Sequence, residues 1–424
     1  MNRAIVLDIT HLTSRRQARP HTGIDRVDIA IARMVSEGGA GQVLGLHAGL
    51  LGAKVVTRSH IASLVAGPTT ASSEVDQDAL LKEEIRSWIR TPDTGQKPAV
   101  PMARRRAGKA PFLRQQDWRL LHSNRGLTIP EEAIYLNAAP YGTPVNDYRW
   151  LDRRTDVKAV FFVHDLLPID HPEFFPPQWQ PTFRQMVSFV MRRADALIVA
   201  SEVTRARVEL ELRRHPARKV AVVVAPLAAP PPFCREAAPD ETLRQHPYFV
   251  MCSTIEPRKN HRTVLNVWQQ LLRDNPSTTP ALVLIGKRGW KDEAVAAMLD
   301  GSTNLRSRVL EVSAASDRVL HWLLSNAAAA LMPSFAEGYG LPIVEALSLG
   351  VPIIASDMPL FREVSQGRAT FCDPHMPEEW VRSICALTDR SGPSWKNASL
   401  QARAFRRPTT AVFSKRISEL LGAL

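Results

Sequence analysis

The sequence predicts an α/β protein with two domains of similar size, each built on a parallel sheet, and a cleft between them. Short apolar runs alternate with amphipathic stretches along nearly all of the 424 residues, a pattern typical of parallel strands that are buried on both faces and joined by helices. Hydrophobic residues make up 45% of the chain, enough for large cores. A proline-rich segment, residues 225–241, interrupts the alternation and divides the chain into parts of similar size.

The expected strands are the apolar runs of the two halves. In the N-terminal half they are residues 4–10, 42–48, 133–139, 157–165 and 195–201. In the C-terminal half they are residues 248–254, 281–287, 309–313, 328–334, 351–357 and 369–373. Helical periodicity is clearest at residues 261–274 and 316–328, where apolar side chains recur every three to four positions.

These elements give a domain plan for the chain. We expect an N-terminal domain over residues 1–230, a linker over 231–245, a second domain over 246–400, and a C-terminal helix within 401–424 that packs back on the N-terminal domain. Residues 66–118 are rich in Pro, Ser, Thr, Gly and charge around one plausible helix, 79–90, and predict a mobile insertion on the N-terminal domain. The run Arg104–Arg106 within it either touches anionic lipid or nucleic acid or belongs to a solvated loop.

Composition narrows the class of protein. The net charge is +12 and the pI is near 9.9, which fits a phosphate-bearing partner, an anionic membrane face or nucleic acid, or simply a basic cytosolic protein. No run of eighteen apolar residues predicts a membrane span, and the apolar run before Asp8 is too short for a secretory signal. Four cysteines without a CxxC pair suggest free thiols in a reducing, cytoplasmic compartment, and no spacing predicts a structural metal.

Two glutamates, Glu337 and Glu345, flank a glycine-containing turn that leads into a predicted helix. Gly338 and Gly340 let the backbone approach a ligand, and Pro342 suits the first turn of the helix. Glu337 precedes the helix, whereas Glu345 lies about one turn inside it. Carboxylates accept hydrogen bonds from paired hydroxyls, so this pattern predicts a sugar or ribose site. The alternative is an exposed helix residue beside an unrelated turn residue.

A pair of cations, Arg258 and Lys259, lies between a strand expected to end at Thr254 and a helix expected to begin near Asn260. Cations at a helix N-terminus oppose the helix dipole, which is unfavourable. A ligand-binding role for the two cations is therefore favoured over two charges that merely face solvent. Arg supplies a planar fork and Lys a compact charge, which together suit a diphosphate.

Two further residues are candidates in the N-terminal domain. His164 ends an apolar strand where a neutral imidazole can exchange hydrogen bonds with a ligand, although a structural histidine fits equally well. Gly23 follows a polar loop and precedes a helix whose expected buried face carries Ile24, Val27, Ile31 and Val35, and it either admits a substrate close to the backbone or is a simple loop glycine.

Together these motifs resemble those of retaining glycosyltransferases of family 4, which have the GT-B architecture of two facing Rossmann-like domains. The resemblance covers most of the chain and is strongest over residues 248–365, where the E-x7-E pattern runs from Glu337 to Glu345. The loop EPRKN (256–260) and the segments VHDLLPI (163–169) and PEFF (172–175) are similar to those of bacterial mannosyl- and rhamnosyltransferases of surface-polysaccharide synthesis.

The resemblance implies a role for each candidate residue. Arg258 and Lys259 would bind the donor diphosphate, and Glu345 the nucleotide ribose. Glu337 would hold donor-sugar hydroxyls and act with His164 near the reacting carbon. The turn would contribute backbone groups of Gly338, Tyr339, Gly340 and Leu341. Gly23 would lie in a loop near the donor phosphate or the acceptor.

The expected function is transfer of a hexose, mannose or a deoxyhexose, from a nucleotide diphosphate sugar to a lipid-linked oligosaccharide in exopolysaccharide, capsule or O-antigen (lipopolysaccharide) synthesis. The enzyme would be cytoplasmic or peripheral on the inner, anionic face of the cell membrane, with no metal or other cofactor and no nucleic acid partner. The alternatives are a sugar-nucleotide epimerase of the same fold and a basic nucleic-acid-binding protein.

Overall fold

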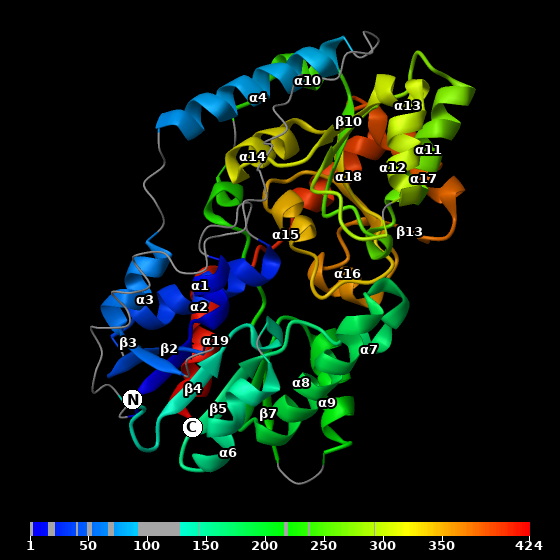
Figure 1. Cartoon of the computed structure of the whole chain (residues 1–424). Helices are drawn as coiled ribbons and strands as arrows, with labels where there is room; N and C mark the ends of the chain where they lie inside the picture. Colours follow the sequence, from blue (N-terminus) through cyan, green and yellow to red (C-terminus); the bar gives the residue numbers. More distant parts are fainter. Residues whose placement is uncertain are drawn as a thin grey trace. The chain divides into compact units, whose positions relative to one another are not determined.

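The computed structural model describes most of the chain in two compact units. The described residues are 3–15, 22–39, 41–48, 53–66, 72–91, 128–142, 144–215, 219–235, 238–291 and 293–424. The N-terminal unit draws on residues 1–69, 103–227 and 409–424, and the C-terminal unit on residues 70–102 and 228–408 (Figure 1).

The N-terminal unit is built on a seven-stranded sheet in the order β3-β2-β1-β4-β5-β6-β7. All neighbouring strands are parallel except β2 and β3, which are antiparallel. Its strands are β1 (Ile5–Asp8), β2 (Val43–His47), β3 (Lys54–Thr57), β4 (Ile134–Asn137), β5 (Lys158–Phe162), β6 (Ala196–Val199) and β7 (Ala221–Val224). The sequence predicts five of these strands, while β3 and β7 are additional.

The C-terminal unit is built on a six-stranded, fully parallel sheet in the order β10-β9-β8-β11-β12-β13. Numbered within this unit, the order is 3-2-1-4-5-6, which is that of a dinucleotide-binding Rossmann sheet. Its strands are β8 (Tyr248–Cys252), β9 (Ala281–Ile285), β10 (Val309–Val312), β11 (Ala329–Met332), β12 (Ile353–Ser356) and β13 (Thr370–Cys372). All six lie within the predicted runs.

Helices connect the strands of both sheets. In the N-terminal unit they are α1 (Thr10–Arg15), α2 (Gly23–Glu37), α3 (Arg58–Val65), α6 (Arg149–Arg153), α7 (Leu167–Asp170), α8 (Gln180–Arg193), α9 (Glu202–Leu212) and α19 (Thr410–Gly422). In the C-terminal unit they are α4 (Ser72–Arg90), α10 (Glu241–Gln245), α11 (His261–Asp274), α12 (Glu293–Gly301), α13 (Thr303–Arg308), α14 (Asp317–Asn326), α15 (Leu341–Ser348), α16 (Pro359–Val364), α17 (Pro377–Thr388) and α18 (Pro393–Arg403). Among the described residues, single 3-10 turns occur at η2 (Pro140–Gly142), η3 (Val145–Tyr148), η4 (Pro172–Phe174), η5 (Pro177–Trp179), η6 (Pro231–Cys234) and η7 (Pro257–Lys259).

Helix α11 shows how the apolar pattern produces this fold. It spans the same residues, 261–274, as the predicted helix. Its buried stripe includes Val264, Leu265, Trp268 and Leu271, which pack into the core under β8 and β9. The fully buried Trp268 also donates its indole N–H to the carbonyl of Pro280 at 2.9 Å, so its one polar atom is satisfied.

Helix α4 corrects the expected position of the insertion. It belongs to the C-terminal unit, where it lies along α10 (Figure 1), and not to the N-terminal domain. Arg86 pairs with Asp240 at 2.9 Å, and Asp78 pairs with Arg318 at 3.2 Å. These partners lie more than 150 residues away, so the local sequence did not reveal them. The rest of the expected insertion, including Arg104–Arg106, lies largely outside the described residues.

The chain's last helix, α19, lies in the N-terminal unit, where it contacts α2 and β7. Its apolar face buries Phe413, Ile417, Leu420 and Leu421. In the described part of the chain, no helix has both the length and the apolar character needed to cross a bilayer. The four cysteines form no disulfide with one another; only Cys372 is fully buried, and Cys385 is exposed.

Candidate functional site

The predicted site residues of the C-terminal unit gather where the strand order of its sheet reverses. Strands β8 and β11 are neighbours at the centre of the sheet, and their following loops run out in opposite directions. Arg258 and Lys259 lie in η7 after β8, which ends at Cys252 and not at Thr254 as predicted. Ser334 and Glu337 follow β11. A crevice at the carboxyl ends of such strands is the usual ligand site of an open parallel sheet.

Glu337 is the centre of an ion-pair cluster at this edge of the sheet. Its Oε2 accepts from Nη1 of Arg258 at 2.7 Å, and its Oε1 accepts from Nζ of Lys259. The hydroxyl of Ser334 donates to the same Oε1 at 2.8 Å. The other arm of Arg258 contacts Glu256 at 2.8 Å. The cluster therefore joins the two loops by charge-assisted hydrogen bonds, which are stronger than neutral ones.

Backbone contacts fix the same two loops in register. The carbonyl of Arg258 accepts from the N–H of Phe335 at 2.8 Å, and Nη1 of Arg258 donates to the carbonyl of Ala336 at 3.2 Å. The guanidinium is thus held from the backbone as well as from Glu337. A cation held in place in this way needs little reorganisation when a ligand binds.

Glu337 is ionised at neutral pH. Burial acts to raise the pKa of Glu337, but the charges of Lys259 and Arg258 outweigh it and lower the pKa to about 2. Burial lowers the pKa of Lys259, and the neighbouring Glu337 opposes that shift. Only 7% of the Glu337 side chain and 12% of the Lys259 side chain are exposed, so solvent screens this pair weakly.

The turn between Glu337 and α15 has the conformation that its glycines suggest. Gly340 has φ of 101°, in the left-handed region, and precedes α15 directly. Pro342 occupies the first turn of the helix, as predicted. Gly338, Tyr339 and Leu341 complete the path, and Tyr339 is largely buried.

Glu345 lies on the inner side of α15, between the buried residues Val344 and Ala346. Its side chain is only 3% exposed, which contradicts the alternative of a solvent-facing helix residue. Glu337 and Glu345 thus lie on a turn and on the helix that follows it, within one connection between β11 and β12.

Asn260 was expected only to mark the start of a helix. In the structure it also organises the loop that carries Arg258 and Lys259. It adopts φ of 56° and ψ of 39°, and its Oδ1 caps α11 by accepting from the N–H of Thr263 at 3.4 Å. Its Nδ2 donates to the carbonyls of Pro333 and Pro374, each at 3.1 Å. One side chain therefore ties three loops together at the carboxyl edge of the sheet.

Asn260→Asp is expected to lower the free energy of unfolding by about 1–3 kcal/mol, because the carboxylate keeps the cap but cannot donate to the two buried carbonyls. The measurement is urea unfolding followed by circular dichroism. Asn304→Asp, on the exposed face of α13, is the matched control and should leave the midpoint unchanged. Equal midpoints for both variants would contradict this role.

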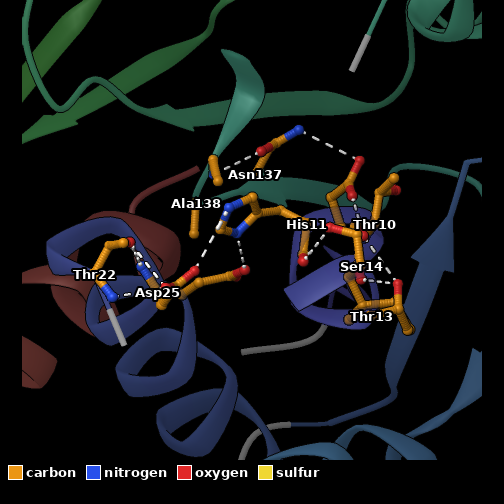
Figure 2. Close-up of polar contacts among 12 residues, drawn as sticks. Thr10, His11, Thr13, Ser14, Thr22, Asp25, Asn137 and Ala138 are labelled. Carbon is orange, nitrogen blue, oxygen red and sulfur yellow. Dashed lines mark hydrogen bonds and ion pairs between the residues drawn. The ribbon is translucent and has the colours of Figure 1, made fainter. Parts of the chain in front are cut away.

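A second group of polar side chains lies at the equivalent position in the N-terminal unit, where its strand order reverses between β1 and β4. Figure 2 shows His11, which follows β1, turned toward Asp25 of α2. Its Nδ1 lies 3.0 Å from a carboxylate oxygen of Asp28, and its Nε2 lies 3.7 Å from Asp25. Asn137, at the end of β4, donates to Asp8 at 3.3 Å.

His164 joins this group from the loop after β5, as predicted for a residue at the carboxyl end of a strand. Its Nε2 lies 2.7 Å from the carbonyl oxygen of Ala138. A carbonyl only accepts, so Nε2 carries the proton and Nδ1 is the lone-pair nitrogen. Burial lowers the pKa of His164 to about 4, so the ring is neutral near pH 7.

Gly23 is the first residue of α2 and not part of the preceding loop, which refines its expected position. Thr22 is the N-cap, and Thr22 and Asp25 form a capping box: the N–H of Thr22 donates to Asp25 at 2.7 Å (Figure 2). The buried face of α2 includes Val27, Ile31 and Val35, but Ile24 is 39% exposed and lies outside it.

Sequence reasoning missed His11, Asp25 and Asp28, although one signal was available. His11 follows the strand that ends at Asp8, just as His164 follows β5. Parallel strands end at the same edge of a sheet, so both histidines belong to that edge. Asp25 and Asp28 lie on α2. The T-x-x-D pattern of residues 22–25 marks Asp25 only as part of a helix start, and Asp28 carries no short motif.

Comparison with known proteins relates the C-terminal part of the chain to a described family. Residues 235–404 match the family described as glycosyl transferases group 1. These residues contain β8 to β13, with the Arg258, Lys259 and Glu337 cluster and Glu345.

Two kinds of curated relatives are similar to the chain. The serotype-specific mannosyltransferase WbdA of Escherichia coli is 29% identical over 241 residues, which cover 53% of this chain and 29% of WbdA. The chain thus matches less than a third of the length of that relative. O-antigen chain mannosyltransferase B of Escherichia coli is 27% identical over 316 residues, covering 68% of this chain and 80% of the relative.

Solved structures resemble the fold over the whole chain. HepE of Anabaena in complex with UDP and glucose has a TM-score of 0.60 at 14% identity, covering all of both chains. Sucrose-phosphate synthase from Thermosynechococcus elongatus has a TM-score of 0.60 at 15% identity, covering 100% of this chain and 99% of that one. At such identities the likeness concerns the fold, and it confirms the predicted pair of Rossmann-like domains of the GT-B type.

Proposed function

We propose, from the match of residues 235–404 to the glycosyl transferases group 1 family, that the chain is a retaining glycosyltransferase of the family 4 type. It moves a hexose from a nucleotide diphosphate sugar to an acceptor in surface-polysaccharide synthesis. The observation that carries the proposal is the pair of partly buried cations, Arg258 and Lys259, held beside Glu337 at the reversal point of a Rossmann sheet.

The cations suit the leaving group of this reaction. Breaking the bond between the sugar C1 and the phosphate oxygen leaves the electron pair, and thus negative charge, on a nucleoside diphosphate. The fork of Arg258 and the ammonium of Lys259 stabilise that charge in place, with no protein-bound metal ion. The diphosphate replaces Glu337 as their partner in part, which frees carboxylate lone pairs for the hydroxyls of the donor sugar.

The remaining residues have distinct proposed roles. Glu345 binds the nucleotide ribose, and backbone groups of Gly338 to Leu341 line the sugar. His164, in the N-terminal unit, offers its neutral Nδ1 to a hydroxyl of the donor sugar, while Gly23 opens the helix near the donor phosphate or the acceptor. In retention the acceptor oxygen attacks C1 from the side of the departing phosphate, whose oxygen takes the acceptor's proton.

Mannose is the proposed hexose, with a deoxyhexose second, and a lipid-linked oligosaccharide at the inner membrane face is the proposed acceptor. Both reported relatives are mannosyltransferases, and one of them is an O-antigen chain mannosyltransferase. The net charge of +12 suits a peripheral position on anionic lipid.

Donor binding is tested by a thermal-shift panel of GDP-, UDP-, dTDP- and ADP-sugars. A ligand that binds only the folded state raises the melting temperature by mass action, so one sugar nucleotide should stabilise the wild-type protein. Arg258→Gln and Lys259→Gln should each remove most of that shift, because each loses a charge that faces the diphosphate. Arg382→Gln, at an exposed position of α17, is the matched control.

The same preparations separate transfer from the alternatives. Incubation with the sugar nucleotide alone should yield no isomer, which an epimerase would produce, and transfer to acceptor should continue in EDTA. A shift of wild-type size in both Arg258→Gln and Lys259→Gln would refute the assignment of the diphosphate site.

A further inference from the structure

A cavity of about 600 Å³ lies at the other edge of the C-terminal sheet. Its wall includes Ala327, just before β11, and Val351 and Pro352, just before β12. These residues precede the amino ends of parallel strands, whereas Arg258 and Glu337 follow the carboxyl ends. The cavity is therefore separated from the proposed donor site by the length of the sheet, and both lie within the C-terminal unit.

The wall of this cavity is strongly basic. It carries five arginines, Arg235, Arg244, Arg390, Arg403 and Arg407, and no acidic residue among its described lining residues. In the described part of the chain, no carboxylate lies within ion-pair distance of Arg390, Arg403 or Arg407. Among the described residues, the one carboxylate within ion-pair distance of Arg244 is that of Glu241. It lies 3.9 Å away, on the exposed face of the same short helix. A concave wall with one sign of charge focuses its field on an anion.

Two of the guanidinium groups are already held in place. Arg390 donates to the carbonyl of Asn326 at 2.8 Å, and its guanidinium carbon lies 4.8 Å from the ring centre of Trp395. Arg407 donates to the carbonyl of Cys234 at 2.8 Å. A guanidinium has five N–H donors, so each retains donors for a ligand.

The same wall holds an arginine whose charged form is disfavoured and two serine hydroxyls that lack a hydrogen-bond partner in the described structure. Burial lowers the pKa of Arg390, and the like charge of Arg244 adds to this effect. The hydroxyls of Ser325 and Ser348, both lining residues, are buried without a hydrogen-bond partner in the described structure. Serine has a single side-chain torsion, so a rotamer change suffices to turn such a hydroxyl toward a ligand.

We propose that this arginine-lined cavity is a second binding site, for an organic phosphate, distinct from the nucleotide-sugar site. The fork geometry of arginine matches phosphate oxygens, and the volume exceeds that of a lone phosphate ion, leaving room for the group that carries it. The serine hydroxyls suit the polar part of that group. Soluble glycerol or sugar phosphates and the headgroups of anionic phospholipids share this chemistry.

The test compares pyrophosphate and glycerol 3-phosphate in thermal-shift titrations of the full chain. Arg403→Gln combined with Arg407→Gln should weaken the response to glycerol 3-phosphate at least tenfold in half-saturating concentration. Pyrophosphate, which the proposed diphosphate site of Arg258 and Lys259 also binds, should keep most of its response. The control Arg382→Gln should respond like the wild type. Both cavity arginines are exposed, and the single variants provide a second measurement should the double variant be unstable.

The donor-site variant Arg258→Gln separates this proposal from the proposed function. It should lose the shift with sugar nucleotide but retain the shift with glycerol 3-phosphate, which it binds at the cavity. Loss of the glycerol 3-phosphate response in Arg258→Gln, or its full retention in the double variant, would overturn the second site while leaving the donor site intact.

Vesicle sedimentation distinguishes the two sources of phosphate. Wild-type protein is mixed with vesicles of phosphatidylglycerol and phosphatidylcholine or of phosphatidylcholine alone. Binding to the anionic vesicles that the double variant loses assigns the cavity to a headgroup, whereas equal sedimentation of both proteins together with a weakened soluble response assigns it to a soluble phosphate. No difference in either assay would refute the proposal.

Discussion

Glu337→Gln is expected to lower the rate of glycosyl transfer by about two to three orders of magnitude, the loss typical when one preorganised electrostatic group is removed from an active site. The amide keeps the shape of the side chain but has no charge. Arg258 and Lys259 then lose the partner that now holds them at hydrogen-bond distance, and the donor sugar loses a carboxylate acceptor. The measurement is the steady-state rate with saturating donor.

The same substitution is expected to destabilise the unliganded protein by about 3 kcal/mol, because it leaves two largely buried cations without their shared counter-charge. Donor diphosphate supplies negative charge to the same cations, so saturating sugar nucleotide should recover part of this loss. Glu378→Gln, on the exposed start of α17, is the control for both measurements. Wild-type rate and stability in Glu337→Gln would contradict the cluster's role.

The dependence of stability on acidic pH tests the ion pairs of Glu337 separately. The folded-state pKa of Glu337 is about 2, below its usual 4.5, so its contribution to stability is complete above about pH 4.5 and is lost as the pH falls toward 2. His164 and His261 have folded-state pKa values lowered by burial to about 4 and about 3, so they also destabilise the protein as the pH falls below 6.5. Both histidines remain in Glu337→Gln, whose stability should therefore fall less steeply than that of wild type between pH 5 and 3.

The strands and the strongest helices were predictable because their apolar patterns are local. Helix α11 has the predicted bounds since its buried stripe and its Asn260 cap are both written in consecutive residues. Strand β3 was not predicted because it is a four-residue antiparallel edge strand, and β7 was not predicted because its residues are only partly buried and precede the proline-rich segment. The place of α4 depends on Asp240 and Arg318, distant residues that no local pattern connects to it.

The sequence predicted which loops carry the candidate site, but not the contacts between their side chains. Sequence placed Arg258, Lys259 and Glu337 after strands, and the sheet order, which makes β8 and β11 neighbours, brings those loops together. The direct contacts of Glu337 with both cations depend on side-chain geometry that spacing does not encode. The group of His11, Asp25 and Asp28 was missed for a related reason: its members come from two helices, α1 and α2, whose side chains meet only in the folded unit.

Gly286→Ala is expected to be the most destabilising of the proposed glycine substitutions, by at least about 3 kcal/mol. Gly286 follows β9 with φ of 155°, and a methyl group there would lie 1.9 Å from the carbonyl oxygen of Ser253, which follows β8. Backbone atoms would have to move, because no side-chain rotation relieves this clash. The N–H of Gly286 donates to the carbonyl of Val312 at 2.9 Å and that of Ser253 to the carbonyl of Ile285 at 2.9 Å, so the movement also disturbs the hydrogen bonds that join β9 to β10 and to β8.

Gly367→Ala separates this clash from backbone strain alone. Gly367 has φ of 70°, but nothing lies within 4 Å of its added methyl, so only the cost of a left-handed alanine, about 1–2 kcal/mol, is expected. Urea unfolding of both variants gives the comparison. Ser253 leads into the segment that carries Arg258 and Lys259, so Gly286→Ala should also weaken the thermal shift with sugar nucleotide while Gly367→Ala preserves it. If the two variants lose equal stability and bind donor equally, the close approach of β9 to the end of β8 does not position the cations.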